Sequence, residues 1–175
     1  MGGLLNGAAF ESIADADSRL GPVLEVLVGG AYYWAPFACI KYLVIEGPRD
    51  ARDFAWLPAQ FVWRNGDRSM GFIPARYPGS ERSDNDAIRL ARTTRWQHIG
   101  ENSPAGLGQR LLKTNTGTIG ILDVIDLSVA PDASASHAQV GPARDGAGSQ
   151  VTHGERPGEE FELTGSFPQC DLTGK

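Results

Sequence analysis

The sequence contains few of the residues on which disulfide and metal chemistry depend. Only two cysteines, Cys39 and Cys170, and three histidines occur in 175 residues. Two cysteines cannot build a disulfide framework or a four-cysteine zinc site. Such low cysteine usage suits a reducing cytoplasm, and we predict no cofactor.

The few histidines are poorly placed for nucleophilic catalysis, which needs a Ser or Cys beside a histidine and an orienting acid. His98 follows Trp96 in a segment that reads as a loop, while His137 and His153 lie in a segment that we expect to be disordered. No catalytic set emerges, and we predict that the protein is not an enzyme.

Long hydrophobic runs and an excess of basic residues are also lacking. No run of about 20 apolar residues could span a bilayer, and the N-terminus MGGLLNGAAF does not resemble a signal peptide. The net charge of -5 argues against a general nucleic-acid binder, which needs clustered Lys and Arg. We therefore expect a cytoplasmic protein whose partner is neither membrane nor nucleic acid.

What is present is a series of short apolar segments separated by turn signals, in a chain that is 41% hydrophobic. Residues 23–28 and 31–37 flank Gly29-Gly30, and Asn65-Gly66 separates another two such segments. Both pairs predict β-hairpins, because these dipeptides favour the turns that join antiparallel strands. Further strands are expected at 40–45 and between 109 and 129.

Two short helices are expected among these strands. The first covers a turn or two within 50–57. The second begins at Ser83, whose hydroxyl can cap the first turn, and Asp84 and Asp86 place negative charge at the positive end of the helix dipole. Residues 97–108 read as a loop, in which Gly106 and Gly108 provide a tight entry to the last strands.

Together these segments predict a mainly β (α+β) fold, with a curled, mostly antiparallel or mixed sheet of six to seven strands and two short helices. Residues 1–22 are expected to be an irregular lead-in, and residues 23–130 a β-rich domain. The remainder, 131–175, is rich in Gly, Pro, Ser and Ala and lacks periodicity, so we predict a disordered tail. The pattern leaves open whether the chain dimerises by sheet-edge pairing.

Four aspartates are the best candidates for a metal site, since hard cations prefer carboxylate oxygens: Asp15, Asp17, Asp84 and Asp86. A metal-dependent or enzymatic domain built on them is the alternative hypothesis. Capping and turn formation explain the same residues better.

Six motifs together resemble the C-terminal, β-rich part of the ImpE/TagJ family, over roughly residues 8–129 in order. They are Asp15-Ala16-Asp17-Ser18-Arg19, Tyr33-Trp34-Ala35-Pro36-Phe37, Arg49-Asp50 with Arg52-Asp53, Arg76-Tyr77-Pro78-Gly79-Ser80, Ala87-Ile88-Arg89-Leu90 and Gly108-Gln109-Arg110.

The resemblance implies a non-enzymatic accessory protein of the bacterial type VI secretion system, cytoplasmic and linked to virulence. Family members contact the small subunit of the contractile sheath and are linked to sheath recycling by an AAA+ unfoldase. Members begin with a helical domain that this sequence does not contain, so a truncated remnant without function is a further alternative. The residues expected to contact the partner are Trp34, Arg76, Tyr77, Arg89 and Arg92.

Overall fold

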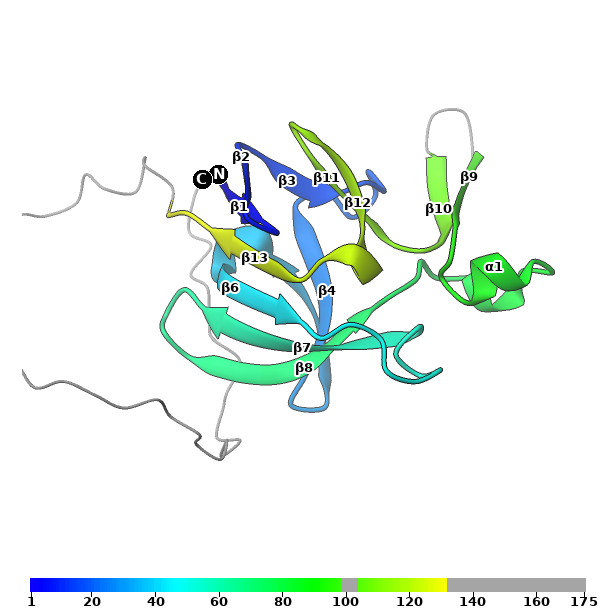
Figure 1. The fold of residues 1–175 in the computed structure, drawn as a ribbon, viewed down its shortest axis with the longest axis horizontal. Coiled ribbons are helices and arrows are strands. Elements are labelled where there is room, and N and C mark those ends of the chain that lie inside the picture. The colour runs from blue at the N-terminus through cyan, green and yellow to red at the C-terminus, as the bar shows by residue number, and fades with distance from the viewer. Residues whose placement is uncertain (99–103, 132–175) are drawn as a thin grey trace, which may run out of the picture.

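A computed structural model describes residues 1–98 and 104–131, which form three antiparallel sheets with few helical turns (Figure 1). The mainly β fold that the sequence predicts is confirmed. The predicted number of strands is wrong, because the described residues form thirteen strands rather than six or seven. Most of the additional strands are three to five residues long, too short for an alternating pattern to identify.

The largest sheet has eight strands. Their spatial order is β2 (Ala8–Phe10), β1 (Gly3–Leu5), β13 (Asp126–Val129), β6 (Ile40–Ile45), β7 (Trp56–Trp63), β8 (Arg68–Pro74), β4 (Val23–Val28) and β5 (Ala31–Pro36).

The two smaller sheets lie at the top and upper right of the view in Figure 1. One small sheet contains β12 (Gly117–Gly120), β11 (Leu111–Thr114) and β3 (Ile13–Asp15), and the other contains β10 (Pro104–Gly108) and β9 (Thr94–His98). The helical turns are η1 (Phe37–Cys39), η2 (Ser80–Arg82), α1 (Asp86–Arg89) and η3 (Ile121–Asp123).

Both predicted hairpins are present. Gly29 and Gly30 have φ values of 58° and 80°, as a two-residue turn with positive φ at both positions requires, and they join β4 to β5. Asn65-Gly66 joins β7 to β8, but only Gly66 has positive φ. The Trp63 N–H donates to the Asp67 carbonyl, so a three-residue connection replaces the expected two-residue turn.

Three local predictions need correction. Residues 1–22 are not an irregular lead-in, because they contain β1, β2 and β3. Strand β1 pairs with both β2 and β13, and β3 pairs with β11. Residues 97–108 are not simply a loop, since β9 and β10 form a two-stranded sheet. The expected helical segment at 50–57 contains turns and then the beginning of β7. The predicted tail lies almost entirely outside the described residues.

The short helix after η2 has a different N-cap from the one predicted. Its first residue is Asp86, and the Asn85 side chain accepts a hydrogen bond from the Ala87 N–H at 2.8 Å. Ser83 instead accepts from the Asn85 N–H. The helix ends after one turn because Ala91 adopts a positive φ of 53°.

The core forms where side chains from the sheets face inward. Strand β7 illustrates the alternation: Leu57, Ala59, Phe61 and Trp63 are buried, and the rings of Phe61 and Trp63 stack at 5.1 Å. The other three tryptophans lie at the surface, with exposed fractions between 39% and 58%. One of the four tryptophans, Trp63, is therefore part of the core.

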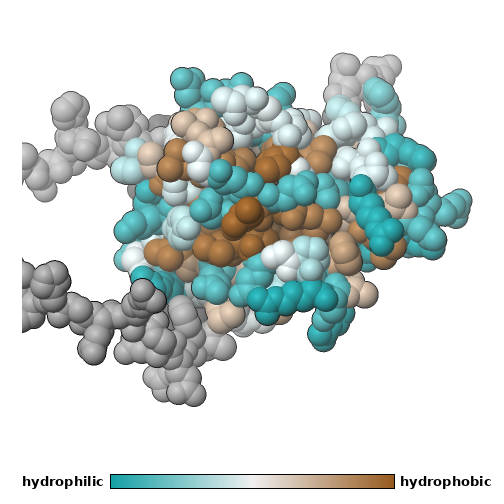
Figure 2. Space-filling view, viewed as in Figure 1, coloured by the Kyte–Doolittle hydropathy of each residue, from teal (hydrophilic) through white to brown (hydrophobic). Residues whose placement is uncertain are grey.

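The surface also carries hydrophobic residues. In Figure 2 they form a band across the middle of the visible face, where β6, β7 and the segment leading into β13 lie. In the part of the chain that is described, no helix is long and apolar enough to cross a membrane.

Candidate functional site

A fully buried arginine lies between two acidic side chains in the interior. Arg110, which directly precedes β11, has no exposed side-chain surface. Its Nη1 donates to Asp15 Oδ2 at 2.8 Å, and its Nη2 donates to Glu25 Oε2. The three residues come from separate parts of the sequence, since Asp15 ends β3 and Glu25 lies in β4. Together they form an ion network that joins the two larger sheets.

Tyr77 completes the inner side of this network. Its hydroxyl donates to Asp15 Oδ1 at 2.7 Å and accepts from the Leu111 N–H at 3.2 Å. The Arg110 guanidinium carbon lies 5.3 Å from the centroid of the Tyr77 ring, within the range of a cation–π contact. The ring is fully buried.

A second buried carboxylate extends the network toward β10. The Asp17 N–H donates to Asp15 Oδ1 at 2.8 Å, and Asp17 Oδ2 accepts from the Gly106 N–H at 3.0 Å. The guanidinium of Arg19 donates to both Asp17 oxygens, at 2.9 and 2.6 Å. The two aspartates therefore hold the turn after β3 against β10.

The environment changes the pKa values of these groups in different directions. Burial raises the pKa of Asp15, although Arg110 opposes the change, and burial lowers the pKa of Arg110, although Asp15 opposes it. Burial and the Asp15 charge raise the pKa of Tyr77, so its hydroxyl stays protonated. Burial would raise the pKa of Asp17 too, but Arg19 and the Gly106 N–H outweigh it and lower this pKa to about 2.

The network also reaches the surface. Glu25 Oε1 accepts a hydrogen bond from the Tyr32 hydroxyl, and the Tyr32 oxygen in turn accepts from Trp34 Nε1 at 3.2 Å. Trp34 is 58% exposed. Hydrogen bonds therefore run without interruption from an exposed indole on β5, through Glu25 and Arg110, to Asp15 in the interior.

A cleft opens where strands β4 and β8 separate. Their pairing is limited to Leu27 with Phe72 and Val28 with Gly71. Beyond these pairs a cavity of about 350 Å³ lies between the strands. Its lining includes Glu25, Tyr32, Trp56, Arg76 and Arg110. The cleft thus combines aromatic walls with charged groups of both signs.

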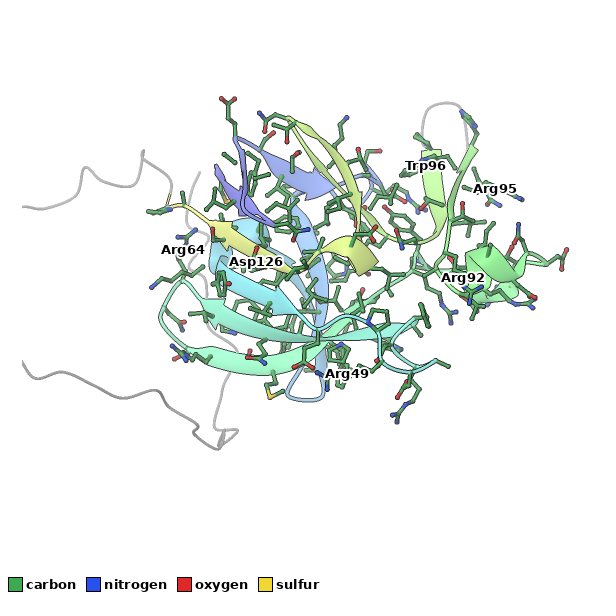
Figure 3. The ribbon with its side chains drawn as sticks, in the orientation of Figure 1. Arg49, Arg64, Arg92, Arg95, Trp96 and Asp126 are labelled. Carbon is green, nitrogen blue, oxygen red and sulfur yellow. The ribbon has the colours of Figure 1, made fainter. Side chains whose placement is uncertain are left out.

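A larger groove of about 910 Å³ lies on the other side of the loop that contains Tyr77, between β8 and η2. It runs between α1 and β9–β10 and is lined by Arg19, Arg82, Arg95, Asp84 and Asp86, among others. Figure 3 shows Arg92, Arg95 and Trp96 at this end of the molecule, which carries α1 and β9.

The structure distributes the five predicted partner-binding residues between surface and interior. Trp34, Arg89 and Arg92 are exposed, and Arg76 is half-buried. Arg76 Nη1 donates to the Arg89 carbonyl, so these two residues lie together. Tyr77 is fully buried and can affect a partner only by supporting the residues around it.

Three of the four aspartates of the metal hypothesis, Asp15, Asp17 and Asp86, pair with other side chains. Asp15 and Asp17 bind Arg110, Tyr77 and Arg19, as described above, and Asp86 pairs with Arg89. Among the residues that the structure describes, no three His, Cys, Asp or Glu side chains are arranged to hold a metal ion.

Sequence reasoning missed Glu25 and Arg110 as members of a site. One signal was available, because each is a charged residue beside or within an apolar strand segment, and the two charges are opposite. The predicted tight entry at Gly106 and Gly108 is explained by contacts, since the Gly108 N–H donates to Ser80 Oγ at 2.7 Å.

Comparison with known proteins identifies the family. The family described as ImpE protein matches residues 7–128, well over half of the chain. The chain belongs to the ImpE family. The resemblance that the sequence motifs indicated is thereby confirmed. Three of those motifs meet in the buried network of this ImpE-family chain, namely residues 15–19, 76–80 and 108–110.

Two relatives of this ImpE-family chain are longer than the part that it matches. It is 41% identical over 129 residues to the type VI secretion system accessory component TagJ of Pseudomonas aeruginosa, a match that covers 74% of this chain and 44% of TagJ. The crystal structure of VPA1032 from Vibrio parahaemolyticus is similar with a TM-score of 0.68 at 27% identity, covering 77% of this chain and 50% of that one. The chain thus spans half or less of the length of these relatives.

Proposed function

We propose that this chain is a non-enzymatic accessory component of bacterial type VI secretion that acts in the cytoplasm by binding a protein. One observation carries the proposal: membership of the ImpE family, together with 41% identity to the accessory component TagJ. The role of a protein-binding module fits a chain whose buried charges are engaged with one another.

The buried network fits a structural role better than a catalytic one. Asp15 and Glu25 neutralise Arg110, and the raised pKa of Tyr77 keeps its hydroxyl protonated as a donor to Asp15. A general base needs a pKa near the working pH and access to substrate. Buried, paired groups of this kind instead fix the relative positions of the surrounding strands.

The partner that we propose is the small subunit of the contractile sheath. The surface we assign to it extends from Trp34, which touches Tyr32 in the cleft, past Arg76 to Arg89 and Arg92 on the α1 side. Aromatic and arginine side chains are favoured where protein partners bind, because they combine large contact area with hydrogen bonding. Tyr77 is buried beneath this surface and helps to hold the surrounding residues in place.

A binding measurement with purified proteins tests the proposal. The full chain, immobilised, is expected to retain the sheath small subunit at micromolar concentrations and not to retain an unrelated acidic protein of similar size. Equal retention of both proteins, or of neither, would contradict the proposed contact. Titration by calorimetry then gives the dissociation constant for the variants discussed below.

A further inference from the structure

Strand β5 forms one edge of the eight-stranded sheet and lacks the features that normally protect an edge. It pairs with β4 in unbroken register from Val23–Pro36 to Val28–Ala31. No other strand among the described residues pairs with its outer side. Its sequence, AYYWAP, has no charged residue, and proline occurs only at its end. Edges are usually protected by lysines, bulges or internal prolines.

The turn before β5 determines which backbone groups point toward the open edge. Because a two-residue turn makes Val28 and Ala31 a hydrogen-bonded pair, the β4-facing groups recur at Tyr33 and Ala35. The N–H and C=O groups of Tyr32 and Trp34 therefore point away from β4. These two residues offer two donors and two acceptors in a row.

We propose that a second copy of this chain pairs with this edge through its own β5, in antiparallel orientation. With a two-fold axis at Tyr33, Tyr32 of each copy lies opposite Trp34 of the other. The four outward groups on each strand then form four hydrogen bonds across the axis, and the two sheets become continuous. This inference does not depend on the sheath contact.

The edge is complementary to itself in charge and in shape. Strand β5 carries no charged side chain in either copy, so pairing about the axis brings no like charges together. Ala31 lies opposite Ala35, and Gly30 opposite Pro36. Proline, which has no N–H, thus falls where the ladder ends.

The apolar face of the sheet continues across the same edge. Register places Pro58, Phe72, Leu27 and Tyr32 in one row across four strands. Phe72 is 44% and Tyr32 49% exposed. In the paired sheet, Trp34 of the second copy extends this row and covers part of the Tyr32 ring, a cross-strand aromatic contact that stabilises antiparallel pairs. A peptide with charged side chains would place them against this apolar row and would therefore pair with the edge less favourably.

Sedimentation equilibrium of the full chain tests the proposal. We expect twice the mass of one chain at micromolar concentrations, with amide exchange at Tyr32 and Trp34 slowing as concentration rises. Trp34→Pro removes an outward N–H from each copy without removing a β4 bond, and we expect it to raise the dissociation constant about tenfold or more. Trp34→Val, which keeps the N–H, is expected to weaken pairing less.

Met70→Lys distinguishes edge pairing from stacking of apolar faces, because Met70 lies on the same face as Phe72 but away from the edge. We expect it to dimerise as the wild type does. A monomer at all concentrations, rapid exchange at Tyr32 and Trp34 in the dimer, or loss of the dimer in Met70→Lys would overturn the proposal. So would protection of these amides only when another protein is added.

Discussion

Arg110 and Tyr77 bind the same carboxylate from two sides while they contact each other. Each donates to a different oxygen of Asp15, at 2.8 and 2.7 Å, and the guanidinium lies over the tyrosine ring. This arrangement joins β3, the loop after β8 and the start of β11 at one point. It also places the positive charge of Arg110 between the carboxylates of Asp15 and Glu25.

Removal of this charge should destabilise the fold strongly. Arg110→Met leaves Asp15 and Glu25 buried without their cation, and loss of one partner of a buried ion network costs about 3–5 kcal/mol. Urea unfolding measures the loss. Arg52→Met serves as the control, because the Arg52–Asp50 pair is exposed to solvent and should contribute much less to stability than the buried network. Equal losses in the two variants would show that Arg110 has no special structural role.

Gly106→Ala should lower stability through a direct clash. A Cβ at this position would lie 2.4 Å from two carbon atoms of the Tyr77 ring, which is fixed within the network. Overpacking of this kind costs about 1–3 kcal/mol, measurable as a lower Tm. Gly47→Ala is the matched control, since nothing lies within 4 Å of its Cβ; a comparable drop in that variant would rule out the clash as the cause.

Acid should weaken the fold through Asp17. Its pKa of about 2 lies below the ordinary value of 3.8, so its ionised form stabilises the folded state above about pH 4. This contribution, about 2 kcal/mol, is lost as the pH falls from 4 to 2. Asp15 acts in the opposite sense, because its pKa is raised.

The effect of Asp17 is isolated by comparison with Asp17→Asn. We expect the variant to unfold more easily than the wild type at pH 7 and the difference to shrink below pH 4. Chemical denaturation at a series of pH values gives both curves. A difference that is independent of pH would mean that the Asp17 charge does not stabilise the fold.

Charge reversal on the α1 side should weaken binding of the sheath small subunit. Arg92 is exposed, and its side chain forms no hydrogen bond or ion pair with another described residue. Arg92→Glu is expected to raise the dissociation constant about tenfold, as for a charge that contacts a partner. Arg68→Glu, at the start of β8, makes the same charge change elsewhere on the surface. Indistinguishable affinities for the two variants would exclude Arg92 from the contact.

Sequence predicted best those features that depend on neighbouring residues. Gly29-Gly30 and Asn65-Gly66 mark hairpins because the turn itself requires backbone conformations that these residues adopt easily. The family resemblance could also be recognised from the sequence. The N-cap was misplaced by two residues, from Asn85 to Ser83, because both side chains can accept hydrogen bonds from a helix start.

The features that sequence did not predict depend on residues far apart. Arg110 lies 95 residues from Asp15 and 85 from Glu25, so no local pattern links them. Strand β10 contains Pro104, Gly106 and Gly108, residues with low strand propensity, and forms because β9 pairs with it. Strands β1 and β3 likewise form through pairing with β13 and β11, respectively.

The pairing of β1 with β13 has a consequence for the order in which the protein is made. Asn6 accepts a hydrogen bond from the N–H of Asp126, 120 residues later, and β13 separates β1 from β6 in the sheet. A ribosome must therefore synthesise nearly the whole core before the central strands can close. Until residue 129 emerges, β1 and β6 present open edges, and the nascent chain is most exposed to aggregation during that interval.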